Sequence, residues 1–60
     1  MLVSLVVRTP LSTTAITLPT DTVQEAVQRV VYGYGWLTRG TKIEAWDQRN
    51  AKDFALVDII

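Results

Sequence analysis

The fold is decided by residues 19–35, PTDTVQEAVQRVVYGYG, which carry the start, the body and the end of one amphipathic helix. Thr22 followed by Glu25 is typical of a capping box, and Asp21 with Gln24 offers a second frame for the same device. The two glycines that close the stretch predict the end of the helix. Apolar residues recur at helical spacing and define one face: Val23, Ala26, Val27, Val30, Val31 and Tyr34.

This helix depends on tertiary packing. Valine is a poor helix former, and the four valines together cost the helix about 2 kcal/mol relative to alanine. Burial of each valine side chain returns about 1.5 kcal/mol or more. We therefore expect the helix to form only when it is docked on a sheet. Its polar face is not basic, unlike that of a helix that lies on a membrane.

Strand signals lie on both sides of the helix. Residues 2–7 form a near-continuous apolar run, typical of a strand buried on both faces. Residues 13–18 alternate apolar and small or polar side chains, and a loop around Pro10 joins them to the first strand as a hairpin. Residues 42–47 predict a third strand with modest alternation. Residues 54–60 predict a second near-continuous apolar strand.

The resulting order, ββαββ, predicts a single α+β domain over residues 1–60. The first and last strands are the most apolar, so we expect them to lie side by side and parallel in the middle of the sheet. The more polar second and third strands then become the edges. This gives a four-stranded mixed sheet of order 2-1-4-3 with the helix on one face.

Composition excludes several classes of function. Six Lys and Arg balance six Asp and Glu, which argues against a strongly basic nucleic-acid binder and against an acidic DNA mimic. Histidine and cysteine are both absent, which removes zinc sites, disulfides, thiol nucleophiles and imidazole acid–base chemistry. Asp47, Asp53 and Asp58 match no loop spacing for a cation. We expect no enzyme activity, no metal and no cofactor.

Hydropathy favours a cytoplasmic protein. The apolar run at residues 2–7 is too short for a signal peptide and lacks a basic region before it. No stretch approaches the ~20 apolar residues of a transmembrane helix, so a membrane is not expected as a partner. A chain of this size buries only about 60% of its unfolded surface, so its stability relies on a dense core, self-association or a partner.

Aromatic and basic residues outside the expected core are the candidate binding residues. Tyrosine and tryptophan dominate interface hot spots, although each tryptophan could instead cover one end of the core. Arginines and lysines at two turns, interleaved with tryptophan, also fit a single-stranded nucleic-acid surface, but nearby carboxylates cancel their field and favour a solvated loop face. The candidate protein-binding residues are Tyr32, Trp36, Trp46, Arg39, Lys42 and Arg49.

The expected strands at residues 13–18 and 54–60 could also bind another chain by adding a strand to the sheet. Thr13, Thr14 and Thr17 lie on an uncharged expected edge, and natural edges are usually blunted by charge or proline. Such an edge pairs with a partner strand or forms a symmetric homodimer, unless it is short and twisted away. In another reading, the chain is a structural homo-oligomer that shares the strand of residues 54–60.

Residues 16–23, ITLPTDTV, with the hairpin before them, resemble the strand and helix start of ubiquitin-like β-grasp domains, and the resemblance covers about the first half of this chain. The hairpin, the Pro–Thr stretch and the single helix are also similar to those of small phage takeover proteins such as the T7-type inhibitor of bacterial RNA polymerase. Both resemblances imply protein binding without catalysis. The expected function is thus a small phage or mobile-element inhibitor or adaptor of a host protein, such as RNA polymerase, in the host cytoplasm. The alternatives are a weak single-stranded nucleic-acid binder and a homo-oligomeric structural protein.

Overall fold

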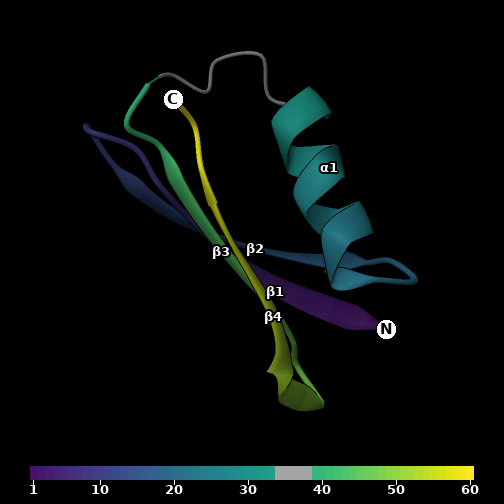
Figure 1. The fold of residues 1–60 in the computed structure, drawn as a ribbon. Coiled ribbons are helices and arrows are strands. Elements are labelled where there is room, and N and C mark those ends of the chain that lie inside the picture. Colours follow the sequence, from purple (N-terminus) through teal and green to yellow (C-terminus); the bar gives the residue numbers. More distant parts are fainter. Residues whose placement is uncertain (34–38) are drawn as a thin grey trace.

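A computed structural model describes residues 1–33 and 39–60 of the chain. Its elements are β1 (Leu2–Arg8), β2 (Thr13–Pro19), α1 (Val23–Gly33), β3 (Lys42–Asp47) and β4 (Asn50–Asp58). The four strands form one sheet, and α1 lies against one face of it (Figure 1). This confirms the α+β class with one helix and a four-stranded sheet.

The order of the strands differs from the expected one. The sheet runs β2-β1-β3-β4, and each neighbouring pair is antiparallel. The predicted order 2-1-4-3 was therefore wrong: β1 pairs with β3, and β4 takes the edge. The turn at residues 48–49 joins β3 to β4 as a tight hairpin, which keeps these two strands adjacent and antiparallel.

The central place of β3 follows from which of its side chains are buried. Ile43 and Ala45 are almost fully buried under α1, while the polar side chains of Lys42 and Glu44 fall on the opposite face. A central antiparallel strand alternates in this way when one face of the sheet is uncovered. Polarity had indicated an edge strand, but here it marks the uncovered face.

The expectation that β1 is buried on both faces was also wrong. Val3, Leu5 and Val7 are buried beneath α1, whereas Ser4 and Val6 on the other face are only half-buried. β2 behaves as its alternation predicts, with half-buried apolar side chains facing the core and exposed ones between them. In the part of the chain that the structure describes, the sheet is thus covered on one face only.

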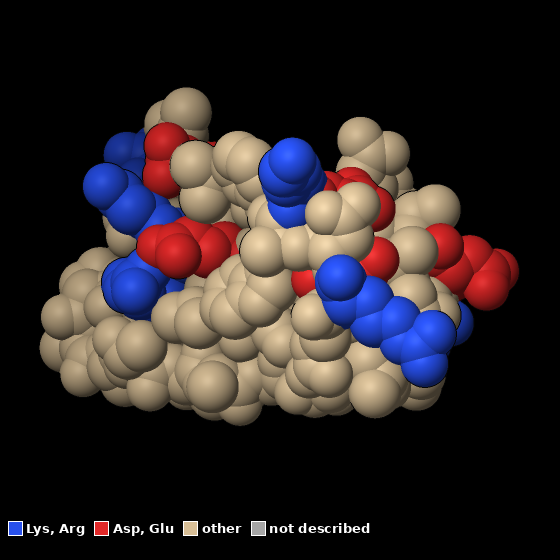
Figure 2. Space-filling model, turned by 90° about the horizontal axis from the view of Figure 1, so that it is seen from below, with Lys and Arg blue, Asp and Glu red and all other residues tan. Residues whose placement is uncertain are grey.

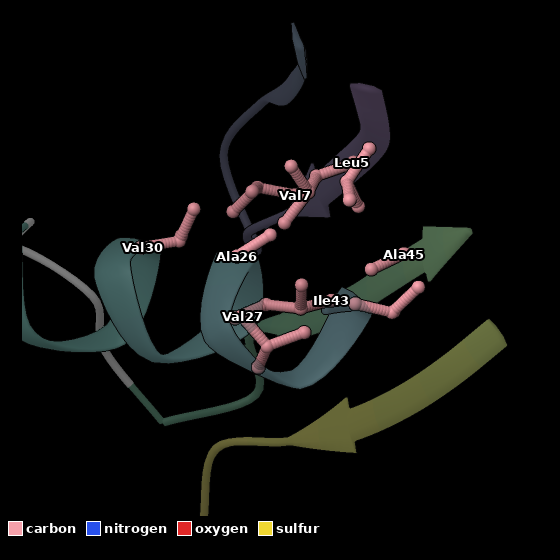
Figure 3. Close-up of a cluster of buried hydrophobic side chains, with 9 residues drawn as sticks. Leu5, Val7, Ala26, Val27, Val30, Ile43 and Ala45 are labelled. Carbon is pink, nitrogen blue, oxygen red and sulfur yellow. The ribbon is translucent and has the colours of Figure 1, made fainter. Parts of the chain in front are cut away.

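The core is a single layer between α1 and the sheet (Figure 3). The predicted helix face is confirmed, because its valines and alanine are buried or half-buried against β1, β3 and β4. Tyr34, the last residue of that face, lies outside the described residues. The fully buried cluster consists of Val3, Leu5, Val7, Val23, Ala26, Val27, Val30, Ile43 and Ala45.

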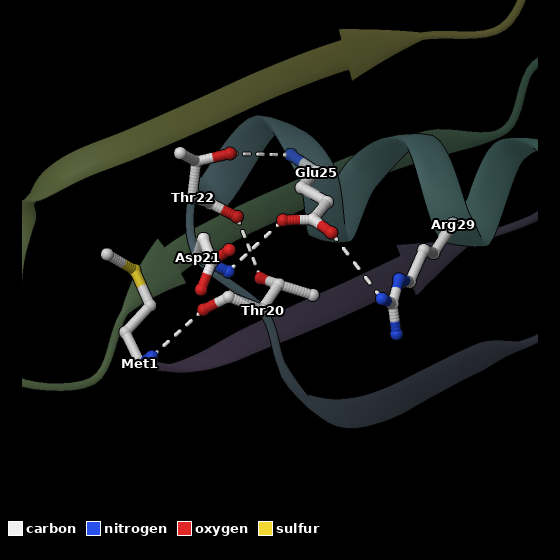
Figure 4. Close-up of polar contacts among 6 residues, drawn as sticks. All are labelled: Met1, Thr20, Asp21, Thr22, Glu25 and Arg29. Atoms are coloured by element: carbon white, nitrogen blue, oxygen red, sulfur yellow. Dashed lines mark hydrogen bonds and ion pairs between the residues drawn. The ribbon is translucent and has the colours of Figure 1, made fainter.

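The start of α1 confirms the predicted capping box. The hydroxyl oxygen of Thr22 accepts a hydrogen bond of 3.0 Å from the amide of Glu25. The Glu25 carboxylate in turn accepts a bond of 3.1 Å from the amide of Asp21, one residue before the cap (Figure 4). Arg29, one turn further on, donates to the same carboxylate at 3.4 Å. The bond to Thr22 satisfies one of the amide groups that the first helical turn leaves free, and the bonds to the Glu25 carboxylate hold that side chain over the start of the helix.

α1 ends at Gly33, after 11 residues. Either Gly33 or Gly35 could take a left-handed cap; Gly33 has no positive φ, and Gly35 lies outside the described residues. Within residues 1–33 and 39–60, a positive φ is found at Gly40, with a value of 85°, just before β3. No helix in these same ranges is long and apolar enough to cross a membrane.

Replacing Thr22 with alanine should lower the free energy of unfolding by about 1 kcal/mol, because the amide of Glu25 loses its acceptor. Urea denaturation followed by circular dichroism measures this loss. The matched control is Thr22→Ser, which keeps a hydroxyl and should unfold at nearly the same urea concentration as the native chain. Equal stabilities of the alanine and serine variants would show that the cap contributes nothing.

Candidate functional site

Among residues 1–33 and 39–60, no element covers the face of the sheet opposite α1. Strand register places its side chains in rows that cross all four strands, because residues directly opposite each other in antiparallel strands point to the same face. We call this surface the open face. It consists of Leu2, Ser4, Val6 and Arg8 of β1, Thr13, Ala15 and Thr17 of β2, Lys42, Glu44 and Trp46 of β3, and Phe54, Leu56 and Asp58 of β4.

Large apolar side chains gather on the β3–β4 side of this face. Trp46 lies directly opposite Phe54 in the ladder, which brings their Cβ atoms to about 5 Å. Phe54 is 60% exposed and Leu56, two residues further along β4, is 69% exposed. We call Trp46, Phe54 and Leu56 the open-face cluster. Trp46 itself is half-buried, and a contiguous apolar surface with exposed members such as Phe54 and Leu56 marks an interaction surface in soluble domains.

The charges of the open face are balanced. Arg8 forms an ion pair with Glu44 across β1 and β3. Lys42 lies directly opposite Asp58 in the β3–β4 ladder. Figure 2 shows blue and red atoms interspersed, without a surface of a single sign, beside a broad uncharged region. Exposed ion pairs of this kind contribute less than about 1 kcal/mol to stability, but they shape which partner charges are accepted.

Four of the six predicted binding residues lie along β3 or at its ends. Trp46 and Lys42 share the open face of β3, and the four-residue spacing separates them by roughly 13 Å. Arg39 and Lys42 line the same shallow hollow, together with Asp58. Arg49 lies at the other end of β3, in the turn to β4, and borders a different hollow. The structure thus brings Arg39 and Lys42 together and keeps Arg49 apart.

The other two predicted binding residues do not join this surface. Tyr32 is 84% exposed, as its place on the polar side of the helix predicted, but it belongs to α1 on the opposite side of the sheet (Figure 1). Trp36 lies outside the described residues. Trp46 does not cover an end of the core, because the sheet separates the open face from α1.

Sequence reasoning missed Phe54 and Leu56 as surface residues. They were assigned to a buried central strand because residues 54–60 are almost continuously apolar. The available signal was Asp58, which shares the parity of Phe54 and Leu56 and therefore their face of the strand. A carboxylate in that row predicts an exposed face even where its neighbours are apolar.

The carboxylates considered as cation ligands are spread along the β3–β4 hairpin. Asp47 accepts a hydrogen bond of 3.0 Å from the amide of Arg49 in the turn, while Asp58 ends β4 opposite Lys42. Within the described ranges, no three residues of ligand type gather closely enough to hold a metal ion. The hydroxyl of Ser4 accepts a bond of 2.9 Å from the Gln48 side chain, which ties the start of β1 to the same turn.

Comparisons with protein-family models, with curated proteins and with solved structures find no match for this chain. The resemblances to ubiquitin-like domains and to T7-type inhibitors therefore stay predictions. Any functional assignment has to be argued from the chemistry of the open face and of the sheet edges.

Proposed function

We propose that this chain is a non-catalytic protein-binding module that contacts its partner through the open face. The observation that carries the proposal is the open-face cluster: Phe54 and Leu56 are exposed, and the half-buried Trp46 lies directly opposite Phe54 on the same face. Burial of such side chains against a partner supplies most of the free energy of a typical interface. Aromatic side chains also lose little conformational freedom when they are bound.

The arrangement of charge around the cluster supports this assignment. Arg8, Lys42 and Asp58 occupy the end of the open face away from Trp46 and Phe54, and Glu44 borders the cluster opposite Leu56. An apolar centre with a polar margin is the usual composition of a protein–protein interface. Because both signs are present, the margin favours one orientation of the partner over the others.

In its narrower form, the proposal is that the partner is a host protein such as bacterial RNA polymerase and that binding blocks a surface of it. This form rests on the resemblance to small phage takeover proteins. Steric blockade needs no cofactor and suits a chain without histidine or cysteine. The open face also fits blockade, since it is a continuous surface made by all four strands.

The proposal predicts that Phe54→Lys abolishes partner binding while the chain still folds. Phe54 is exposed on an edge strand, so lysine is tolerated there, but it places a charge in the centre of the cluster. We expect at least a tenfold loss of binding, the effect of removing one interface hot spot. The measurement is capture of tagged chain from lysate of the cells that make it, followed by quantitative mass spectrometry.

The matched control is Leu11→Lys. Leu11 is 97% exposed in the β1–β2 loop, outside the open face, so the same substitution there should leave capture unchanged. Equal capture by the native chain and both variants would refute the assignment of the open face. Recovery that disappears after nuclease treatment would favour the single-stranded nucleic-acid alternative, whose affinity should also fall steeply with salt.

A further inference from the structure

We propose that the outer edge of β4 pairs with β4 of a second copy of this chain, antiparallel and centred on Ala55. The inference concerns the edge of the sheet and does not rest on the proposed function of the open face. Among the described strands, β4 has β3 as its one neighbour and, with nine residues, is the longest. Its free edge therefore presents unpaired backbone groups that a further strand can use.

The middle of β4 has none of the usual protection of an edge strand. Residues 54–57, FALV, contain no charge, proline or glycine. Phe54 and Leu56 are strongly exposed within this segment, so a free edge leaves them in water. Natural sheets usually place lysine, proline or a bulge in the middle of such an edge to prevent pairing. Here the bulge lies nearer the turn, where the register shifts between Trp46 and Asp47.

When two copies of β4 pair with Ala55 opposite Ala55, the side chains of one copy lie opposite matching side chains of the other. Phe54 then lies opposite Leu56 of the second copy, and the symmetry repeats this pair on the other side of the centre. Both pairs fall on the open face, where aromatic and aliphatic side chains on neighbouring strands stabilise a sheet. Four of the exposed apolar side chains of the two chains would thus be covered by one another.

The charges select this register over its neighbours. Centred on Ala55, Lys52 lies opposite Asp58 of the second copy, twice by symmetry. Lys52 precedes the regular part of the ladder, so its long side chain must reach across to make this contact. Moving the centre to Leu56 would set Phe54 against Asp58, and moving it to Phe54 would set Lys52 against Leu56. On the open face, apolar side chains then meet apolar ones and Lys52 meets Asp58, whereas Asp53 comes opposite Val57.

The edge formed by β2 is less suited to pairing with a second copy of itself. β2 places Thr13, Ala15 and Thr17 on the open face, so pairing two copies there would cover no large exposed side chain. Pro19, at the end of β2, also lacks an amide hydrogen for the ladder. Pairing of β4 with β4 keeps both helices on one side and joins the two open faces into a continuous sheet surface.

Sedimentation equilibrium tests the inference. As the chain concentration rises from about 10 µM to about 1 mM, the mass should rise from 6.7 kDa towards twice that value. Leu56→Lys puts a lysine opposite Phe54 of the second copy and should weaken dimerisation at least tenfold. The matched control, Thr17→Lys, introduces a lysine on the open face of the other edge strand and should dimerise like the native chain. Both variants should give native circular dichroism spectra, because both sites are exposed.

Amide hydrogen exchange then identifies the interface. Dimerisation through the edge should slow exchange at residues 54–57 as concentration rises and leave β2 unchanged. A mass of 6.7 kDa at the highest concentration would overturn the inference and leave the proposed function of the open face standing. Doubling of the mass in Leu56→Lys, or doubling in the native chain without protection of β4, would overturn it as well. The last result would indicate that two open faces pack on each other.

Discussion

Substitution of Ala45 by aspartate is expected to unfold the protein. Ala45 is 1% exposed, lies in the middle of β3 under α1, and faces Leu5 and Ala55 across the two ladders. A carboxylate at this position loses its hydration among apolar side chains, at a cost of at least about 4 kcal/mol. A domain of this length has a free energy of unfolding of about 3–9 kcal/mol. One substitution therefore removes most or all of it.

The matched control for this variant is Ala15→Asp. Ala15 is exposed on the open face of β2, so its carboxylate stays hydrated, and we expect a loss of no more than about 1 kcal/mol from lower strand propensity. Circular dichroism and urea denaturation distinguish the two variants. In the order 2-1-4-3, residue 45 would lie on an edge strand, where a charge is tolerated. A stable Ala45→Asp variant would thus contradict the central position of β3.

Elements set by local signals were predictable from the sequence. The cap formed by Thr22 and Glu25 involves residues three positions apart, and both backbone hydrogen bonds of this device lie within one helical turn. The turn after Arg8 brings β1 and β2 together as a hairpin over a few residues. The alternation in residues 13–18 reports directly which side chains face the core. In each case the cause and its consequence are close in sequence.

The order of the strands was not predictable in the same way. Residues 54–60 are more apolar than residues 42–47, and that contrast suggested that the last strand is central. The overall polarity of a strand combines the side chains of both its faces. Because only one face of this sheet is covered within the described ranges, that overall value does not show which strand is central. Ile43 and Ala45 face the core from an otherwise polar strand, while Phe54 and Leu56 face solvent from an apolar one.

The unknown position of the covered face also explains which residues of the candidate site were predicted and which were missed. Trp46 and Lys42 were identified by residue type and do lie on the open face, but as members of a central strand. Phe54 and Leu56 were missed because they were assigned to the core. Asp58 was the one local signal for their exposure; otherwise the exposed face of an apolar strand follows from which face α1 covers, and that depends on tertiary contacts.

The placement of β4 connects the two proposals. An apolar strand at an edge exposes both side chains and backbone groups, so β4 contributes the open-face cluster and a free edge at once. A chain of this size has little surface to divide among separate functions. Association through the edge would widen the open face without covering Trp46, so a dimer can still bind a partner there.

Replacement of Leu5 by alanine is the second change expected to have a large effect. Leu5 is 1% exposed, lies in the central strand β1, and is flanked by Ile16 and Ala45 in the neighbouring strands. Truncation of a buried leucine costs about 3–5 kcal/mol through lost burial and the cavity that remains. Since the core is a single layer, we expect the variant to be partly unfolded at room temperature.

Leu11→Ala provides the matched control, because Leu11 is 97% exposed and the same truncation there removes almost no buried surface. Its urea midpoint should equal that of the native chain, while Leu5→Ala should lose most of its folding transition. Dimerisation through β4 would add stability that grows with chain concentration, so the Leu5→Ala variant should regain structure as concentration rises. A Leu5→Ala variant as stable as Leu11→Ala would mean that β1 does not occupy the centre of the core.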